Sequence, residues 1–187
     1  MDRTGQAMTL LFSMLALVAN AAVLGFAVIA VGGRFSASVA DLRDTVWDRV
    51  GQIALPLGAM VGFTAMLGSL YYSEVQNLIP CTMCWYQRIA MYPLPVILAI
   101  AAWRNDRGIW RYVIPLALIG AILSIYHYQL EWFPEQGSGA CSLLTPCNVP
   151  PFARKFGFIS LAYMALSGFL LIASLTWIAK QTDEGEI

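Results

Sequence analysis

Two cysteines stand three positions apart in the segment Pro80-Cys81-Thr82-Met83-Cys84-Trp85-Tyr86-Gln87-Arg88. A Cys-x-x-Cys pair can cycle between a dithiol and a disulfide, and the preceding proline is typical of a helix start. Thiols at a helix N-terminus ionise more readily because the helix presents partial positive charge there. Since the thiolate is the reactive form, this placement favours redox chemistry. A static disulfide that ties down the helix start is the alternative.

Arg88 follows Cys84 by four residues, so both side chains share one face of the expected helix. It also lies inside an apolar stretch, where a charge is costly and indicates a function. We expect its guanidinium to stabilise a Cys84 thiolate and to donate hydrogen bonds to an oxygen of an electron acceptor. The alternative is an arginine that extends outward to the membrane surface.

A second pair, Cys141 and Cys147, lies in a segment that contains glycine and proline. We expect a mobile loop, in which a disulfide is accessible to an external thiolate, as disulfide exchange requires. Taken alone, such a pair is more often a structural disulfide that constrains the loop. Four cysteines allow three connectivities, and the sequence does not choose among them. Two spans separate the pairs, which disfavours a four-cysteine zinc site.

Two further polar residues lie at expected helix ends. His127 is the single histidine of the chain, and it is a candidate for carrying a proton or donating a hydrogen bond to the acceptor. Glu74 is a candidate for accepting protons or for pairing with Arg88 or His127. An ordinary interfacial or solvated residue is the alternative for each. Glu131 follows His127 by four, and we assign it no role.

The elements that position these residues are membrane helices. The chain has 187 residues, of which 59% are hydrophobic and 12% are charged, whereas soluble domains are about 25% charged. A spanning helix needs about 20 apolar residues. Five stretches qualify, with bounds near Met8–Val31, Ile53–Tyr72, Trp85–Trp103, Tyr112–Tyr128 and Phe158–Ile178. The first is longer than the apolar region of a signal peptide, which favours a retained span over cleavage near Ala19-Asn20-Ala21.

The loop charges predict the orientation. Seven of the 11 Lys and Arg residues fall on one side of five alternating spans, and three fall on the other. The side with more positive charge should be cytoplasmic. Both cysteine pairs then lie on the extracytoplasmic face, where disulfides persist. The first cytoplasmic connection, Gly32–Gln52, has apolar residues at helical spacing, which fits a short interfacial helix as well as a solvated linker.

Electrons from two redox pairs need an acceptor. The chain has no dinucleotide-binding fingerprint, no Cys-x-x-Cys-His motif and too few histidines for haem ligation. By elimination we expect a quinone, ubiquinone or menaquinone, that is reached through the membrane lipid, and no metal. A net charge of +0 gives no indication of nucleic acid as a partner.

Together these residues resemble the signature of the bacterial DsbB family (disulfide bond formation protein B), and most closely its BdbC-type branch. The resemblance covers roughly Ile53 to Ile178, and its motifs are specific in combination. The matching segments are Tyr71-Tyr72-Ser73-Glu74, Cys81 to Arg88, Met91-Tyr92-Pro93, Tyr126-His127-Tyr128, the Cys141 and Cys147 pair, and Phe156-Gly157-Phe158-Ile159.

The resemblance implies a four-helix bundle that passes electrons from an extracytoplasmic thioredoxin-fold oxidase, DsbA/BdbD-like, to a quinone in the bacterial inner (cytoplasmic) membrane. It implies that Cys81 and Cys84 form the quinone-coupled pair, with Cys84 nearest the quinone and Cys81 as the exchanging thiol. Cys141 would form the mixed disulfide with the partner, and Cys147 would be its pair-mate.

By the same resemblance, Arg88 matches the family's quinone-site arginine, His127 its outer-end histidine and Glu74 an acidic position of the BdbC-type branch. The chain departs from the family in its extra first span and in the cysteine spacing of the second pair, which is shorter than in the best-known enterobacterial member. We therefore predict an all-α membrane protein: a DsbB-like four-helix transmembrane bundle with one extra N-terminal transmembrane helix.

The predicted organisation has three parts. Residues 1–52 comprise the extra transmembrane helix and the cytoplasmic amphipathic loop, residues 53–180 the redox bundle, and residues 181–187 a cytoplasmic tail. Two alternatives for the function are a membrane thiol oxidoreductase like vitamin K epoxide reductase and a non-catalytic membrane protein with structural disulfides. The position of the Cys-x-x-Cys pair directly after the second long span disfavours the first of these.

Overall fold

The computed structural model describes residues 3–136 and 154–185, and these residues are almost entirely helical. The long helices are α1 (Arg3–Gly32), α2 (Ala37–Leu70), α3 (Thr82–Met91), α4 (Pro93–Arg104), α5 (Trp110–Trp132) and α6 (Leu161–Gly185). Short turns follow α2 and flank α5, namely η1 (Tyr71–Val75), η2 (Arg107–Ile109) and η3 (Pro134–Gln136). An isolated bridge joins Lys155 and Ile159. The predicted all-α fold class is confirmed.

Within the part of the chain that the structure describes, four helical segments are long and apolar enough to span a membrane: Arg3–Gly32, Ala37–Val75, Arg107–Trp132 and Leu161–Thr182. The expected third span, Trp85–Trp103, is not one helix but two, because α3 ends at Met91 and α4 begins at Pro93. Proline has no backbone N–H to donate and is favoured in the first turn of a helix. Pro93 therefore explains why the helix is interrupted between Met91 and Pro93.

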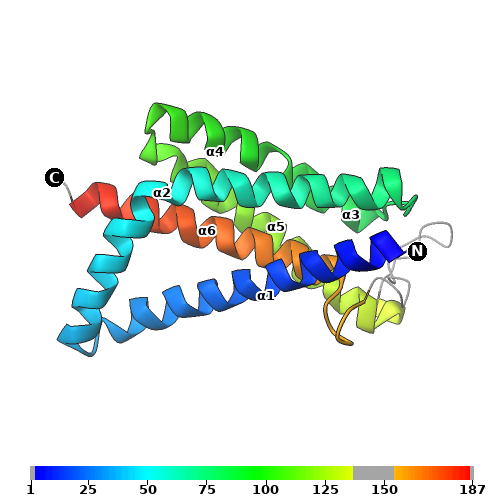
Figure 1. The fold of residues 1–187 in the computed structure, drawn as a ribbon, viewed down its shortest axis with the longest axis horizontal. Coiled ribbons are helices and arrows are strands. Elements are labelled where there is room, and N and C mark those ends of the chain that lie inside the picture. Colours follow the sequence, from blue (N-terminus) through cyan, green and yellow to red (C-terminus); the bar gives the residue numbers. More distant parts are fainter. Residues whose placement is uncertain (1–2, 137–153, 186–187) are drawn as a thin grey trace.

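Figure 1 shows α2, α5 and α6 running along the long axis of the molecule, with α3 and α4 following one another along the same axis. The first part of α2 instead runs across one end of the bundle before the helix bends into the long axis. The segment 32–52 is thus helical from Ala37 onward, but the helix is continuous with the second span. Trp47 in this part packs edge-on against Phe26 of α1, with ring centroids 6.0 Å apart. The division of the chain near residue 52 stays a prediction.

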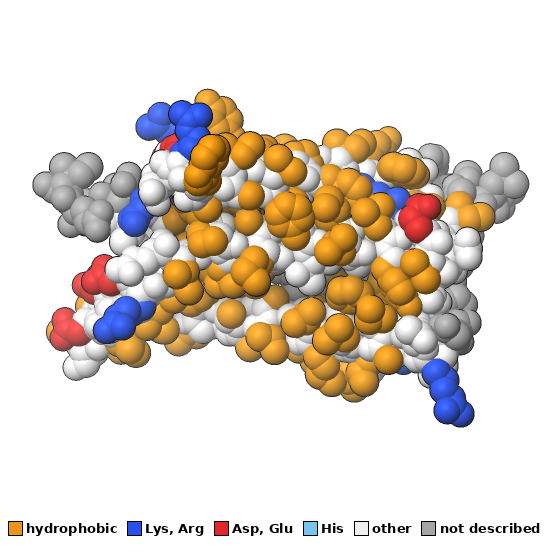
Figure 2. All heavy atoms as spheres, turned by 45° about the horizontal axis from the view of Figure 1, so that its top comes forward, with side chains coloured by type: hydrophobic (Ala, Val, Ile, Leu, Met, Phe, Trp, Pro, Cys, Tyr) orange, Lys and Arg blue, Asp and Glu red, His pale blue; other side chains and the backbone are white. Residues whose placement is uncertain are grey.

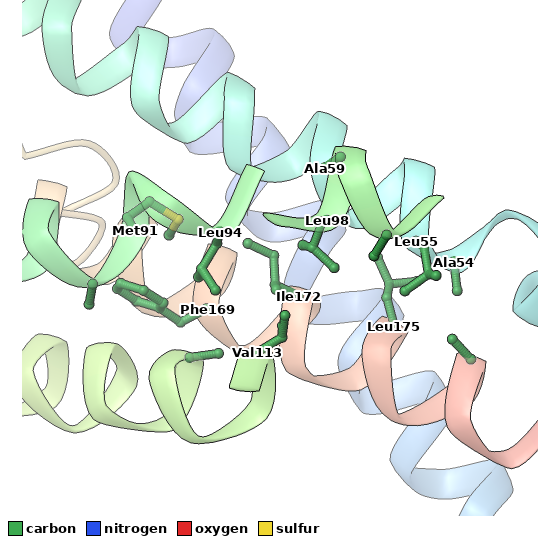
Figure 3. Close-up of a cluster of buried hydrophobic side chains, with 14 of the residues drawn as sticks. Ala54, Leu55, Ala59, Met91, Leu94, Leu98, Val113, Phe169, Ile172 and Leu175 are labelled. Atoms are coloured by element: carbon green, nitrogen blue, oxygen red, sulfur yellow. The ribbon is translucent and has the colours of Figure 1, made fainter. Parts of the chain in front are cut away.

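The core lies between α2, α4, α5 and α6 (Figure 3). Leu94 and Leu98 of α4 are fully buried, and so are Phe169 and Ile172 of α6. Close contact between α2 and α4 depends on small residues: a Cβ atom added at Gly62 would lie 3.0 Å from Cδ of Pro95. The core therefore packs α2 and α6 against each other and holds α4 in place after the break that separates it from α3.

The outer surface is also apolar. Figure 2 shows hydrophobic side chains covering most of the middle of the visible face, with charged side chains mainly toward the two ends. Large side chains such as Val18, Val28 and Ile122 are exposed. A surface of this kind is unfavourable in water and favourable in the hydrocarbon core of a bilayer.

Candidate redox site

The start of α3 positions the first cysteine pair. Cys81 is the N-cap residue of α3, with an extended backbone, and its Sγ accepts a hydrogen bond from the backbone N–H of Cys84 at 3.2 Å. The two sulfur atoms lie 2.6 Å apart. The pair can therefore exchange between dithiol and disulfide with little movement of the backbone. Cys81 is buried, whereas Cys84 is partly exposed.

His127 of α5 approaches the pair from a different helix. Its side chain is buried, and its Nε2 lies 3.5 Å from Sγ of Cys81. Its Nδ1 lies 3.2 Å from Oε1 of Gln87. His127 therefore contacts Cys81, which is the cysteine farther from Arg88 in the sequence. Its contact with Gln87 links it to α3.

A chain of hydrogen bonds defines which nitrogen of His127 carries the proton. The hydroxyl of Ser124 donates to the carbonyl of Gly120 at 2.8 Å, so it accepts from Nε2 of Gln87 at 2.9 Å. The amide oxygen of Gln87 then faces His127, and because this oxygen only accepts, the proton lies on Nδ1. The lone pair of Nε2 in the neutral imidazole consequently points toward the Cys81 thiol. This arrangement allows His127 to accept a proton from Cys81.

These contacts change the acidity of Cys81. The hydrogen bond from the Cys84 thiol lowers the pKa of Cys81 well below its ordinary value, and the contact with His127 lowers this pKa further, while burial opposes both effects. The backbone N–H of Cys84 at the helix start lowers the pKa of Cys81 as well, but it is the smallest of these effects, and activation of the pair by the helix start stays a prediction. Cys81 rather than Cys84 is the thiol that ionises first.

We expect Cys81 to remain a thiolate at neutral pH in the reduced protein. Because its pKa lies below that of a free thiol, about 8.5, the thiolate persists as the pH falls from that value toward the lowered pKa. Its contribution to the stability of the reduced fold is complete above the ordinary thiol pKa and declines through the same range. The thiolate absorbance of a variant that retains Cys81 alone, with serine at the other three cysteines, measures this titration.

In that background His127→Leu should raise the midpoint of the titration, since it removes a hydrogen-bond partner of the thiolate. Tyr126→Phe is the matched control, because Tyr126 is exposed on the same helix turn. A midpoint that His127→Leu leaves unchanged would show that the contact with His127 does not activate Cys81.

Arg88 is anchored to α2. Its Nε donates to Oγ of Ser69 at 2.9 Å, and one of its terminal nitrogens donates to the backbone carbonyl of Ser69 at 3.0 Å. The guanidinium carbon lies 5.1 Å from the centre of the Trp85 ring, a cation–π contact. The described contacts of the Arg88 side chain are thus with Ser69 and Trp85, and its expected stabilisation of a Cys84 thiolate stays a prediction. Arg88 is partly buried, so its remaining donors can face a ligand.

Cys84 and Arg88 line a common cavity of about 160 Å³ between α1, α2, α3 and α6. Ser69 and Gln87 provide further polar groups, and the rest of the lining is mainly apolar, including Met91 and Phe169, which Figure 3 also shows. An amphiphilic ring compound fits such a cavity, because the polar groups can fix its oxygen atoms while the apolar walls cover the rest.

Two predicted acceptor-binding residues lie elsewhere. Neither His127 nor Glu74 is among the described residues that line the cavity. His127 contacts Cys81 and Gln87 instead. Glu74 is exposed on η1 and accepts a hydrogen bond from Ser73 at 3.1 Å. Their assignment to a quinone stays a prediction.

Cys141 and Cys147 lie outside the described residues. The described chain resumes at Arg154, whose terminal nitrogen lies 3.9 Å from a carboxylate oxygen of Glu131. Arg154 also stacks over the ring of Trp132, 4.6 Å from its centre. The segment that follows the second cysteine pair is therefore held against the end of α5, one helical turn beyond His127.

Sequence reasoning missed Glu131. We assigned it no role because it was expected in a loop, yet it lies in the last turn of α5 and its side chain is fully buried. The available signal was its spacing of four from His127, which places both side chains on one helix face. The buried carboxyl group of Glu131 thus faces the Arg154 guanidinium at this end of the bundle, at a distance of 3.9 Å.

The cysteine pair and His127 also form a set that could hold a metal ion. The two Sγ atoms and a ring nitrogen of His127 all lie within 4.8 Å of one another. Thiolate and imidazole are the usual ligands of zinc in proteins. A test of redox function at this site therefore has to distinguish thiols that cycle from thiols that hold a metal.

Comparisons with known proteins identify the family. A model of the family described as "Disulfide bond formation protein DsbB" matches residues 48–179. The chain is 46% identical over 122 residues to disulfide bond formation protein C of Bacillus subtilis, and the aligned region covers 65% of this chain and 88% of the relative. It is 39% identical over 140 residues to probable disulfide formation protein C 2 of Bacillus cereus, and this aligned region covers 75% of this chain and 99% of the relative.

A further relative, the probable disulfide formation protein of Oceanobacillus iheyensis, is 47% identical over 113 residues, or 59% of this chain and 77% of the relative. No solved structure matches the chain. The resemblance to the DsbB family and its BdbC-type branch, predicted from the cysteine motif and the segments around it, is confirmed by the family match and by these relatives. The chain belongs to the DsbB family of disulfide bond formation proteins, a family of helical membrane thiol oxidoreductases.

Proposed function

We propose that this protein is a membrane thiol:quinone oxidoreductase that reoxidises an extracytoplasmic, DsbA/BdbD-like thioredoxin-fold dithiol oxidase. The observation that carries the proposal is the placement of the first cysteine pair between two environments. Cys81 contacts a buried histidine, whereas Cys84 lines an apolar cavity together with Arg88. One thiol is thus suited to exchange and the other to meeting a lipid-soluble acceptor.

Electrons would enter at the second pair. The partner dithiol reduces the Cys141–Cys147 disulfide and itself becomes a disulfide. The resulting dithiol reduces the Cys81–Cys84 disulfide through a mixed disulfide with Cys81. Arg154 and Glu131 hold the end of the second cysteine segment near the end of α5, the helix that carries His127, which supports transfer between the two pairs.

The Cys81–Cys84 dithiol then returns to a disulfide. A bound ubiquinone or menaquinone would take up the two electrons and two protons that this oxidation releases. Arg88 is positioned to donate a hydrogen bond to an oxygen of such a ring, and Ser69 holds the guanidinium in place. His127 holds or accepts the proton of Cys81 at Nε2, which keeps Cys81 available as a thiolate.

The bacterial relatives support a location in the cytoplasmic membrane. The loop charges support an orientation in which both cysteine pairs lie on the extracytoplasmic face. In that orientation the cavity lies toward the outer side of the bilayer, because Cys84 is at the start of α3. Both the soluble partner and the membrane quinone can then approach the same end of the bundle.

Thiol titration of the purified full-length protein tests the proposal against its alternatives. Catalytic disulfides should open under mild reductant and should close again when a soluble quinone analogue is added anaerobically, because strained or accessible disulfides are the easily reduced ones. Disulfides that resist mild reduction would indicate a structural role. Thiols that become reactive only after addition of a chelator would indicate a metal site at Cys81, Cys84 and His127.

A further inference from the structure

The N-terminal helix α1 lies outside the part of the chain that the family model matches, which begins at residue 48. It is nevertheless fixed to the bundle. The side-chain amide of Asn20 donates hydrogen bonds to the hydroxyl of Tyr163 and to that of Ser167, each at 2.9 Å. Polar contacts between helices are specific inside a membrane because few alternative partners exist there. These two bonds set the register of α1 against α6.

In that register, α1 forms part of the cavity wall. Phe12 lines the cavity that also contains Cys84 and Arg88. Its ring lies directly over Gly68 of α2, since a Cβ atom at this glycine would lie 3.0 Å from the ring. The ring of Tyr72 lies beside it, with centroids 6.1 Å apart. The absence of a side chain at Gly68 thus makes room for Phe12.

A buried hydrogen bond also connects α1 to η1, the turn that follows α2. The hydroxyl of Tyr72 donates to Oγ1 of Thr9 at 3.0 Å, and Oγ1 of Thr9 in turn donates to the carbonyl of Gly5 at 2.8 Å. Thr9 is fully buried, and Tyr72 is also buried. Because the Thr9 proton is directed to its own helix, the Thr9 oxygen is oriented to accept from Tyr72. Tyr72, a cavity-lining residue, is therefore held in place by α1.

We propose that α1 is a component of the quinone site: Phe12 closes one wall of the cavity, and Thr9 positions Tyr72. The inference rests on the proposed function. A closed wall keeps lipid chains and water away from Arg88 and Ser69, and hydrogen bonds to a ligand are stronger in such an environment. In this chain the affinity for quinone depends on a helix that precedes the family's matched region, and Phe12 and Thr9 are positioning residues.

The test compares the apparent KM for a quinone analogue with the KM for the partner dithiol in the full-length protein. Phe12→Ala should raise the quinone KM about two- to tenfold, the size expected for the loss of an aromatic contact. Thr9→Val should raise it to a smaller extent, and Thr9→Ser should retain the wild-type value because it keeps the hydroxyl. The partner KM should not change in any of these variants.

Leu10→Ala and Leu11→Ala are matched controls, because both side chains are exposed and neither is among the described residues that line the cavity. An unchanged quinone KM in Phe12→Ala, with full activity, overturns the inference and leaves the proposed function intact. Wild-type protein that reduces no quinone overturns the proposed function itself. If Phe12→Ala lowers the thermal stability, the quinone KM of Phe12→Leu, and that of Thr9→Val compared with Thr9→Ser, tests the inference instead. Equal changes in the quinone KM and the partner KM would mean that α1 has a structural role only, which overturns the inference.

Discussion

Replacement of Cys84 by serine should abolish partner-dependent quinone reduction, with kcat at least about a thousandfold below that of the wild type. Cys84 is the cysteine that lines the cavity, and without it the first pair cannot form the disulfide that releases two electrons. The Cys81 thiolate remains, with its histidine contact and its helix-start hydrogen bond donor. Exchange with the second pair should therefore still begin.

In this variant the Cys81 thiolate can attack the Cys141–Cys147 disulfide, which gives a Cys81–Cys141 mixed disulfide and a Cys147 thiol. Without Cys84 only the reverse attack by Cys147 can resolve this mixed disulfide, so it should be detectable. Mass spectrometry of peptides prepared without reduction detects this product. Thr82→Ser is the matched control, since Thr82 lies exposed between the two cysteines. Full activity of Cys84→Ser, or the absence of the mixed disulfide, would remove Cys84 from the proposed path.

Replacement of Arg88 by alanine should raise the apparent KM for quinone by about 10- to 100-fold, the effect expected for loss of a charged hydrogen-bond donor to a ligand. The partner KM should stay near the wild-type value, because Arg88 contacts Ser69 and Trp85 at the cavity rather than His127 or Cys81. Arg88→Lys should recover only part of the affinity. A lysine retains the charge but cannot donate from a planar fork to both atoms of Ser69.

Steady-state kinetics with each substrate varied in turn measure this difference. Arg104→Ala provides the control, since Arg104 is an exposed arginine at the far end of α4. If an Arg88 variant raised the partner KM and left the quinone KM unchanged, Arg88 would not be a quinone-binding residue.

Local signals made the first cysteine pair predictable. Pro80 and the apolar stretch after Cys84 indicate a helix start, and the structure has Cys81 as the N-cap of α3. The family and the helical class follow from the same motif and from hydropathy. The break in the third span was also visible as Pro93, but the unbroken apolar run led us to expect one helix.

Contacts between distant segments were not predictable in this way. The approach of His127 to Cys81 depends on how α5 packs against α3, and the proton position on His127 depends on Ser124 and Gln87. Hydropathy identifies a spanning helix but not its neighbours, so the contribution of Phe12 to the cavity was not expected. Burial of Glu131 likewise results from α5 continuing one turn beyond the predicted end of its span.

The most direct test of the central claim is anaerobic quinone absorbance in a mixture of the purified protein, a reduced thioredoxin-fold oxidase and a quinone analogue. The account predicts that quinone reduction requires the partner, forms one quinol for each partner dithiol oxidised, and stops in Cys84→Ser. An absorbance that does not change when the partner is added, or that changes equally in Cys84→Ser, would contradict it.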